Sequence, residues 1–320
     1  MCKMTRRPQA TVLASSYNSL QMPPKKFALG FIGAGRVGTG LATGFAHAGV
    51  DVVAIASRKI ASAQKLAKRV RGARACAPQE VADRADIVFL TVPDDAIEAA
   101  AFGVKWRAGS ACVHCSGAAE LDALKKAIAD GALAGGFHPL HMFGEAGDPS
   151  GALAGSAIAL AGPDALVKKL ERLARALGAR PLRLPEGGRA LYHAAANFSG
   201  AFVIALIQET LALWGKLGVA EGAALAALLP LLRGTADNVE KLGAAGGLGS
   251  AVARGDVGTI RRHLDVLAKE APDSLELYRI LSLRTIPLAL EKGTLEPEAA
   301  KEIAALLQSR GVSPLKKSDT

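Results

Sequence analysis

The sequence Phe27-Ala-Leu-Gly-Phe-Ile-Gly-Ala-Gly-Arg-Val-Gly38 decides the fold of this chain. A short apolar run ends in a G-x-G-x-x-G motif, and the stretch that follows keeps helical spacing of its apolar residues. In such a motif the first glycine permits a tight turn, and the second lets the backbone approach a pyrophosphate. The third lets the helix pack closely on the strand. The free N–H groups at the N-terminus of this helix then face the phosphates. The sequence therefore predicts a dinucleotide-binding turn made of Gly33, Ala34, Gly35, Arg36, Val37 and Gly38.

Strand and helix patterns alternate through the first half of the chain. Apolar runs predict strands at 27–32, 51–56, 86–92, 111–115 and 133–137, with helices at 37–48, 59–70, 95–101 and 119–130. Two further strands, near 156–161 and 180–184, flank a helix at 164–177 and are expected to extend the same sheet. This alternation predicts an α/β fold, a doubly wound and mostly parallel Rossmann sheet.

After residue 185 the apolar period becomes helical, without a convincing strand. Helices are expected near 189–217, 221–242, 256–270, 273–291 and 296–309, with a split or kink at Pro230 and a glycine-rich loop at 243–250. We therefore expect an NAD(P)-binding domain at 27–185 and an all-α substrate and dimerisation domain at 186–310. We expect residues 1–26 to be a disordered leader, with Met22 as an alternative translation start. Residues 311–320 are expected to be a frayed tail.

Composition narrows the class of ligand and the compartment. The net charge of +10 favours anionic ligands, but only 4% of the 320 residues are aromatic and the cations are scattered, which argues against nucleic acid. Four irregularly spaced cysteines do not form a disulfide framework, so a cytoplasmic location is expected. Residues 190–207 approach the length of a membrane span, yet they hold polar side chains and predict a buried helix instead.

The end of the second strand indicates which dinucleotide is bound. A carboxylate there would bond the ribose hydroxyls of NAD, whereas this chain has Ser57, Arg58 and Lys59. A hydroxyl and two cations suit a 2′-phosphate, so NADP is the expected cofactor and NAD the less favoured one. The alternative interpretation is that Ser57 only caps the next helix. Val92 and Pro93 end another strand, and we assign them to cofactor contact as well.

Three clusters are candidates for chemistry. Ser116 and His138 follow two neighbouring strands, where ligands bind in open α/β sheets, and His193 shares a helical face with Asn197. Hydride transfer needs a group that exchanges a proton near neutral pH, which suits histidine. We therefore predict proton transfer by His138 and His193 and positioning by Ser116 and Asn197. The alternatives are a core histidine, a strand stop at His138-Pro139 and a simple turn at Ser116.

Other polar motifs have simpler explanations. Cys112 and Cys115 should point to opposite faces of their strand, and no metal site is expected. Asp94 and Asp95 are better explained as helix caps than as ligand contacts. Arg254 could hold a substrate anion, although Asp256 beside it is a plain helix cap.

Together these motifs resemble a bacterial family with a Rossmann-like domain followed by domain of unknown function 2520. The resemblance rests on 33–38, 92–94, 114–117, 137–140, 192–197 and 253–256, and it covers about 27–309. Members are often labelled NADP-dependent oxidoreductases, so the resemblance implies that fold and cofactor. Residues 249–251 read Gly-Ser-Ala where the family tends to have Thr-Gly-Pro.

Two wider resemblances concern the site. The β-hydroxyacid dehydrogenases and ketopantoate reductases carry Lys-x-x-x-Asn on a similar helix, and here His193 replaces the lysine while Asn197 is retained. Prephenate and arogenate dehydrogenases pair a strand-end serine with a His-Pro motif, as Ser116 and His138-Pro139 do here.

The expectation is an NADP-dependent oxidoreductase acting on a small carbonyl, hydroxy or imine substrate. The alternatives are a prephenate dehydrogenase-like enzyme and a non-catalytic NADP-binding sensor or regulatory subunit. We expect a homodimer formed through the C-terminal helices, with neither nucleic acid nor membrane as partner.

Overall fold

The computed structural model describes residues 27–144 and 153–309 and divides the chain into two compact units, 1–196 and 197–320. Each unit is described by itself. The expected leader at 1–26 and the expected tail at 311–320 lie outside the described residues.

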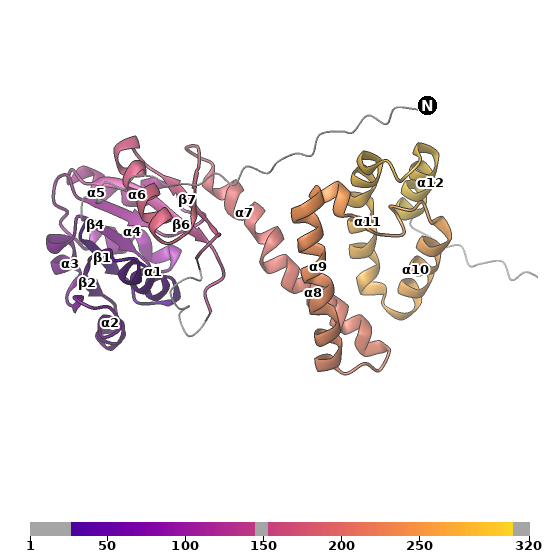
Figure 1. Ribbon diagram of the computed structural model, residues 1–320, viewed down its shortest axis with the longest axis horizontal. Coiled ribbons are helices and arrows are strands. Elements are labelled where there is room, and N and C mark those ends of the chain that lie inside the picture. Colours follow the sequence, from indigo (N-terminus) through magenta and orange to yellow (C-terminus); the bar gives the residue numbers. More distant parts are fainter. Residues whose placement is uncertain (1–26, 145–152, 310–320) are drawn as a thin grey trace, which may run out of the picture. The chain divides into compact units, whose positions relative to one another are not determined.

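The first unit contains one eight-stranded sheet in the order β3-β2-β1-β4-β5-β6-β7-β8 (Figure 1). All neighbouring strands are parallel except β6 and β7, which confirms the mostly parallel Rossmann sheet. The strands are β1 (Leu29–Ile32), β2 (Val52–Ala56), β3 (Arg74–Ala75), β4 (Ile87–Leu90), β5 (Ala111–His114), β6 (Leu133–Leu140), β7 (Ala157–Ala161) and β8 (Arg180–Arg183).

Helices cover both faces of this sheet. They are α1 (Arg36–His47), α2 (Ile60–Ala67), α3 (Pro78–Arg84), α4 (Ile97–Phe102), α5 (Lys125–Ala129) and α6 (Asp164–Ala176), with short 3-10 turns at Asp94–Ala96 and Leu121–Leu124. One core packs α1, α2 and α6 on the sheet, with stacked phenylalanines such as Phe31 and Phe89 at 5.3 Å between ring centroids. The other core packs α3, α4 and α5 on the opposite face.

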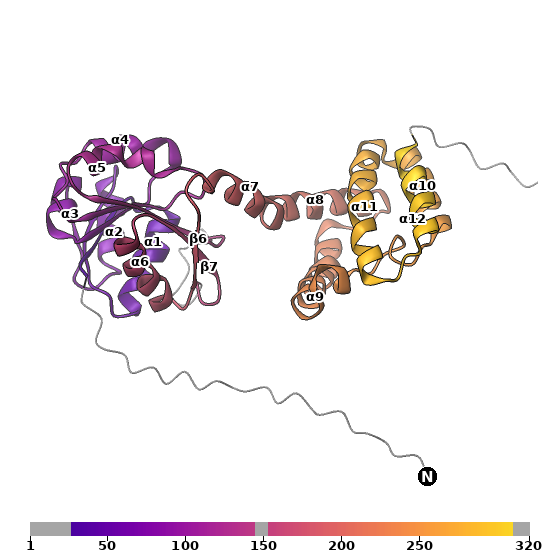
Figure 2. The same ribbon diagram turned by 90° about the horizontal axis from the view of Figure 1, so that it is seen from above.

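The second half of the described chain is helical. Its elements are α7 (Arg189–Ser199), α8 (Ala201–Lys216), α9 (Glu221–Gly247), α10 (Val257–Glu270), α11 (Pro272–Lys292) and α12 (Pro297–Gln308). In the second unit α10, α11 and α12 pack together around a core that includes Ile260, Leu264 and Ile303 (Figure 2). The helix α7 crosses the division between the units, because its residues up to Ala196 belong to the first one.

Several sequence predictions about helices need correction. The expected single helix at 189–217 is two helices, because Gly200 has non-helical dihedrals between α7 and α8. No split occurs at Pro230: α9 continues through it, and its non-helical residue is Gly243, within the expected loop. The expectation of a buried helix at 190–207 is also wrong, since α8 has no buried residue. The segment Arg189–Lys216 is long and apolar enough to cross a membrane by length and composition alone, which is weak evidence for a span.

Candidate functional site

The glycine turn is held tightly from one side. Gly33 has a φ of 120°, and a Cβ built on it would overlap the carbonyl oxygen of Thr91 at the end of β4. A Cβ on Gly38 would overlap the Gly33 carbonyl oxygen in the same way. The Thr91 hydroxyl donates a hydrogen bond to that Gly33 oxygen at 2.8 Å. Only glycine fits at both positions, because the turn and the first helical turn press against the neighbouring strand end.

The other side of the turn is open. A Cβ on Gly35 would meet nothing within 4 Å, and Gly35 and Arg36 are exposed. Gly35 is the N-cap of α1, no side chain caps the helix, and its first turn carries no carboxylate. The helix therefore presents its first N–H groups and its partial positive charge to a space that an anion can fill. These residues fit the pyrophosphate of a dinucleotide.

The segment after β2 is free to take a further phosphate. Helix α2 begins after Lys59 as its N-cap, and no side chain caps it, so the interpretation of Ser57 as the helix cap is wrong. Arg58 and Lys59 are exposed, and neither forms an ion pair with another part of the described chain. A hydroxyl and two uncommitted cations thus stand at the strand end where a dinucleotide carries its adenosine ribose.

Strand register brings the predicted clusters to one edge of the sheet. Ile32, Leu90, His114 and Gly136 lie side by side in the parallel strands β1, β4, β5 and β6. Two residues beyond that row come Ala34, Val92, Ser116 and His138. The glycine turn, the Val92-Pro93 pair and both predicted polar residues therefore share the carboxyl edge, where open α/β sheets bind ligands.

The Ser116 hydroxyl is fully used by the protein. It donates to Asp94 Oδ2 at 2.6 Å and accepts from the N–H groups of Ala118 at 3.1 Å and Ala119 at 2.9 Å. A hydroxyl offers one donor and two acceptor positions, so Ser116 has none left for a substrate. This geometry favours the turn interpretation of Ser116. Asp94 is not the helix cap that we expected, because its carboxylate binds Ser116 and no side chain caps the short turn that it begins.

His138 lies between two aromatic rings from α7. Its Nδ1 is 3.0 Å from the Tyr192 hydroxyl, and the two rings meet edge to face with centroids 5.6 Å apart. The His193 ring also meets it edge to face, at 5.8 Å. A Cβ on Gly117 would overlap His193 Cδ2 and would lie 3.0 Å from His138 Nε2. Gly117 therefore makes room for the two imidazoles, which the structure brings together as the sequence predicted.

Arg189 is the residue that sequence reasoning missed. It opens α7, yet its side chain is fully buried, with Nη1 2.6 Å from the position of a Cβ on Gly136 in β6. The guanidinium donates to the Ser116 carbonyl through Nη2, and the Arg189 backbone N–H donates to Glu120 Oε1 at 3.0 Å. Arg189 thus fastens the first turn of α7 to the loop after β5. The signal in the sequence was Gly135-Gly136, because glycine inside a strand marks a close approach.

Burial and positive charge keep the nearby imidazoles neutral. The pKa of His138 is lowered to about 4 by burial first, and then by Arg189 and His193, while Asp94 opposes the shift. Burial and Arg189 lower the pKa of His114 to about 4 as well. His114 is fully buried, and within the described residues neither of its ring nitrogens has a hydrogen-bond partner. Burial also lowers the pKa of Arg189 and raises the pKa of Tyr192.

Two predicted site residues belong to the second unit. Asn197 follows His193 by one helical turn on α7 but is the first residue of that unit. Arg254 is exposed in the turn before α10. The cap interpretation of its neighbour is confirmed, since Asp256 Oδ1 accepts from the Thr259 N–H at 2.9 Å.

The cysteines lie as their spacing predicted. Cys112 belongs to the core beneath α3, α4 and α5, while Cys115 packs against the core on the other face of the sheet. In the described segments 27–144 and 153–309, no group of three or more His, Cys, Asp or Glu side chains could hold a metal ion.

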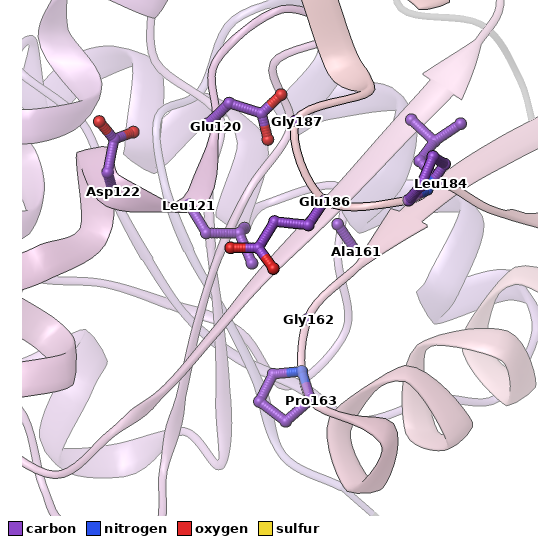
Figure 3. Close-up of a pocket in the computed structure, with 10 residues that line it drawn as sticks. Glu120, Leu121, Asp122, Ala161, Gly162, Pro163, Leu184, Glu186 and Gly187 are labelled. Carbon is purple, nitrogen blue, oxygen red and sulfur yellow. The ribbon is translucent and has the colours of Figure 1, made fainter.

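A pocket of about 560 Å³ opens at the ends of β7 and β8. Figure 3 shows three carboxylates among its lining residues, Glu120, Asp122 and Glu186. Three carboxylates repel phosphates, so this pocket does not suit the anionic part of a dinucleotide. Its Glu120 is nevertheless the acceptor that holds the Arg189 backbone.

Solved structures share this fold. A candidate NADP oxidoreductase from Bacteroides fragilis is 24% identical, with a TM-score of 0.64 and coverage of 82% of this chain and 98% of that chain. A reductive aminase from Aspergillus terreus, in complex with NADPH and ethyl-5-oxohexanoate, is 20% identical, with a TM-score of 0.55 and coverage of 88% and 92%. Pyrroline carboxylate reductase from Plasmodium falciparum, with NADP bound, is 15% identical, with a TM-score of 0.55 and coverage of 88% and 98%.

Family models match both halves of the sequence, whereas no curated protein matches it. Residues 13–139 match the Rossmann-like domain, and residues 156–285 match the domain of unknown function DUF2520. The second match begins before β7, so it includes the last strands of the sheet as well as α7 to α10 and part of α11. The two matches follow one another along the chain in the order that its motifs indicated, a Rossmann-like domain and then DUF2520.

Proposed function

We propose that this protein is an NADP-dependent oxidoreductase that transfers hydride between nicotinamide and a small carbonyl, hydroxy or imine substrate. The observation that carries the proposal is the glycine turn, closed by Thr91 at Gly33 and Gly38 and open at Gly35. The structural relatives add support, because a reductive aminase and a pyrroline carboxylate reductase of this fold are solved with NADPH or NADP.

The choice of NADP over NAD rests on the end of β2. Ser57, Arg58 and Lys59 follow the strand without a carboxylate, and the two cations are exposed. Arginine binds phosphate through paired, charge-assisted hydrogen bonds, which suits the 2′-phosphate that distinguishes NADP.

When bound, the nicotinamide supplies or accepts the hydride. The chain's own residues handle the proton, and His138 and His193 are the proposed transfer groups because their rings meet beside Gly117 at the carboxyl edge of the sheet. Ser116 acts through Asp94 by fixing the loop at the carboxyl edge of the sheet. Asn197 is proposed to hold a substrate oxygen, and Arg254 to contact a substrate anion.

Calorimetry with NADPH and NADH tests the nucleotide site. We expect NADPH to bind the wild-type protein more tightly than NADH, and Arg58→Ala to weaken NADPH binding by on the order of tenfold or more while leaving NADH binding unchanged. Arg71→Ala, at an exposed arginine after α2, is the matched control and should bind both as wild type does. If wild type binds neither nucleotide, the proposal fails.

His193→Ala tests the proton-transfer assignment. The variant should lower turnover with a substrate found by screening metabolites for NADPH oxidation, while its NADPH affinity stays nearly intact. Unchanged turnover would remove His193 from the mechanism. Binding of NADPH without oxidation by any metabolite would favour the sensor or regulatory alternative.

We further propose a cytoplasmic homodimer formed through the C-terminal helices. The support is the exposed apolar surface of α8, where Phe202, Ile204 and Leu206 face solvent in the single chain. Surface of this kind favours association, because burying it removes apolar area from water.

A further inference from the structure

Tyr192 and His138 form a hydrogen-bonded pair at the carboxyl edge of the sheet. The phenol oxygen is 3.0 Å from His138 Nδ1, and the rings meet at 84°. The opposite nitrogen, Nε2, lies 3.0 Å from the position of a Cβ on Gly117, beside the His193 ring. The imidazole therefore has one nitrogen on the phenol and the other toward Gly117, next to a second imidazole. An imidazole in this position can pass a proton from one nitrogen to the other.

The charge around the pair favours an oxygen anion over a nitrogen cation. Arg189 is fully buried, and within the described residues its Nε and Nη1 have no hydrogen-bond partner. The two nearest carboxylates already accept hydrogen bonds, Asp94 from Ser116 and Glu120 from the Arg189 backbone. An iminium ion would have to form beside this cation, whereas an alkoxide would be stabilised by it.

We propose that the substrate of the function proposed above is a carbonyl compound or its alcohol rather than an imine or its amine, with Tyr192 as the proton donor and His138 as the residue that reprotonates it. The carbonyl carbon accepts a hydride from a dihydronicotinamide nucleotide, and the π electron pair moves to the oxygen. The Tyr192 O–H bond breaks as its proton joins that oxygen. His138 then gives the Nδ1 proton to the phenolate and takes one from water at Nε2. The inference rests on the proposed function.

The low pKa of His138 agrees with this relay. Four groups face the imidazole: Arg189, His193, Asp94 and Tyr192. Arg189 and His193 lower the pKa of His138 by more than the Asp94 carboxylate raises it. A neutral imidazole is both donor and acceptor, which the relay requires.

The test uses the full chain saturated with NADP⁺, labelled with ¹⁵N at histidine. Matched probes that differ in one group, 2-propanol against isopropylamine and lactate against alanine, are titrated while the His138 resonances are followed by NMR. We expect the alcohol of at least one pair to shift the His138 signals at a concentration at least tenfold below that of its amine. Tyr192→Phe should abolish the shift and retain NADPH binding.

The chain offers a matched control for the tyrosine variant. Tyr278 and His263 form a similar pair in the second unit, with 2.8 Å between the phenol oxygen and Nδ1 and rings at 87°. Tyr278→Phe should leave the His138 response unchanged, and the His263 signals provide an internal reference. Equal or tighter binding of the amines, no response to any alcohol, or a wild-type response in Tyr192→Phe would each overturn the inference. Calorimetry with NADPH is run on every variant, so a failure of the nucleotide site itself is recognised separately.

Discussion

At the scale of single residues, glycines decide where the chemistry takes place. Gly33 and Gly38 let the nucleotide turn close on β4, Gly117 makes room for two imidazoles, and Gly136 admits the buried guanidinium of Arg189. The spacing of the G-x-G-x-x-G motif predicted the roles of Gly33 and Gly38. For Gly136 the local pattern indicated only a close approach, and for Gly117 only a turn, since their roles depend on side chains 53 and 76 positions later, at Arg189 and His193.

Gly117→Ala tests the packing of the two imidazoles at Gly117. A Cβ there overlaps His193 Cδ2, so the His193 ring has to move away from Gly117 and its arrangement with His138 changes. We expect turnover to fall by about tenfold or more, because small misplacements of reacting groups are costly, while NADPH affinity remains. The control is Gly222→Ala in α9, where a Cβ meets nothing within 4 Å and turnover should not change. A Gly117→Ala enzyme as active as wild type would place the chemistry elsewhere.

The buried histidines predict how stability depends on pH. His114 and His138 have pKa values of about 4 in the folded protein and about 6.5 when unfolded. Between these values the unfolded chain binds protons that the folded protein does not. The free energy of unfolding should therefore fall as the pH falls from about 6.5 to 4, by up to about 1.4 kcal/mol per pH unit for each histidine.

Urea unfolding at a series of pH values measures this dependence. His138→Gln should show a shallower slope than wild type in that window, because one of the two titrating groups is gone. Identical slopes would mean that His138 is not held neutral in the folded protein.

At the scale of elements, the long periodic segments were predictable and the short ones were not. Six of the strand predictions extend little beyond the observed strands, whereas β3 has only two residues and α3 only seven, too few for a visible period. The strand expected at 133–137 continues through Pro139 to Leu140. It can do so because β5 ends opposite Gly136, so one edge of β6 needs no N–H from the proline.

The site was predictable to the extent that topology fixes it. Parallel strands that end in one row bring Ser116 and His138 together, and the sequence showed both strand ends. The partners of those residues could not be predicted, because Asp94 and Arg189 looked like ordinary residues at helix starts. Their burial and hydrogen bonds arise from packing between segments distant in the chain.

Thr91→Val tests the link between β4 and the nucleotide turn. The substitution keeps the shape of the side chain and removes the hydrogen bond to the Gly33 oxygen. We expect unfolding by urea to become about 1–2 kcal/mol easier, since a buried carbonyl loses its partner, and NADPH binding by calorimetry to weaken several-fold. Thr91→Ser, which keeps the hydroxyl, should restore the affinity. Wild-type affinity in the valine variant would show that the turn holds its conformation without Thr91.

At the scale of the whole molecule, the second unit leaves much apolar surface uncovered. Its core lies among α10, α11 and α12, while α8 has no buried residue and α9 has only Ala224 and Leu228. The apolar sequence of α8 predicted a buried helix, and the single chain leaves that helix without a buried residue.

Light scattering at micromolar concentration tests the proposed dimer. Wild type should have twice the mass of one chain, and Phe202→Asp should shift it toward one chain, because a charge would be buried at the interface. Phe102→Asp is the control, since Phe102 is 69% exposed on α4 in the first unit. A wild-type protein with the mass of one chain would refute the dimer.

The anchoring of α7 by Arg189 has a practical consequence for anyone who wishes to isolate the nucleotide half. A fragment that ends with the last strand, near residue 185, would lack Arg189, Tyr192 and His193. The space above Gly136 that the Arg189 side chain fills would then be an empty cavity. A fragment that continues to Ala196 retains the Arg189 side chain. Limited proteolysis should accordingly spare the opening turns of α7 for longer than the residues after Gly200.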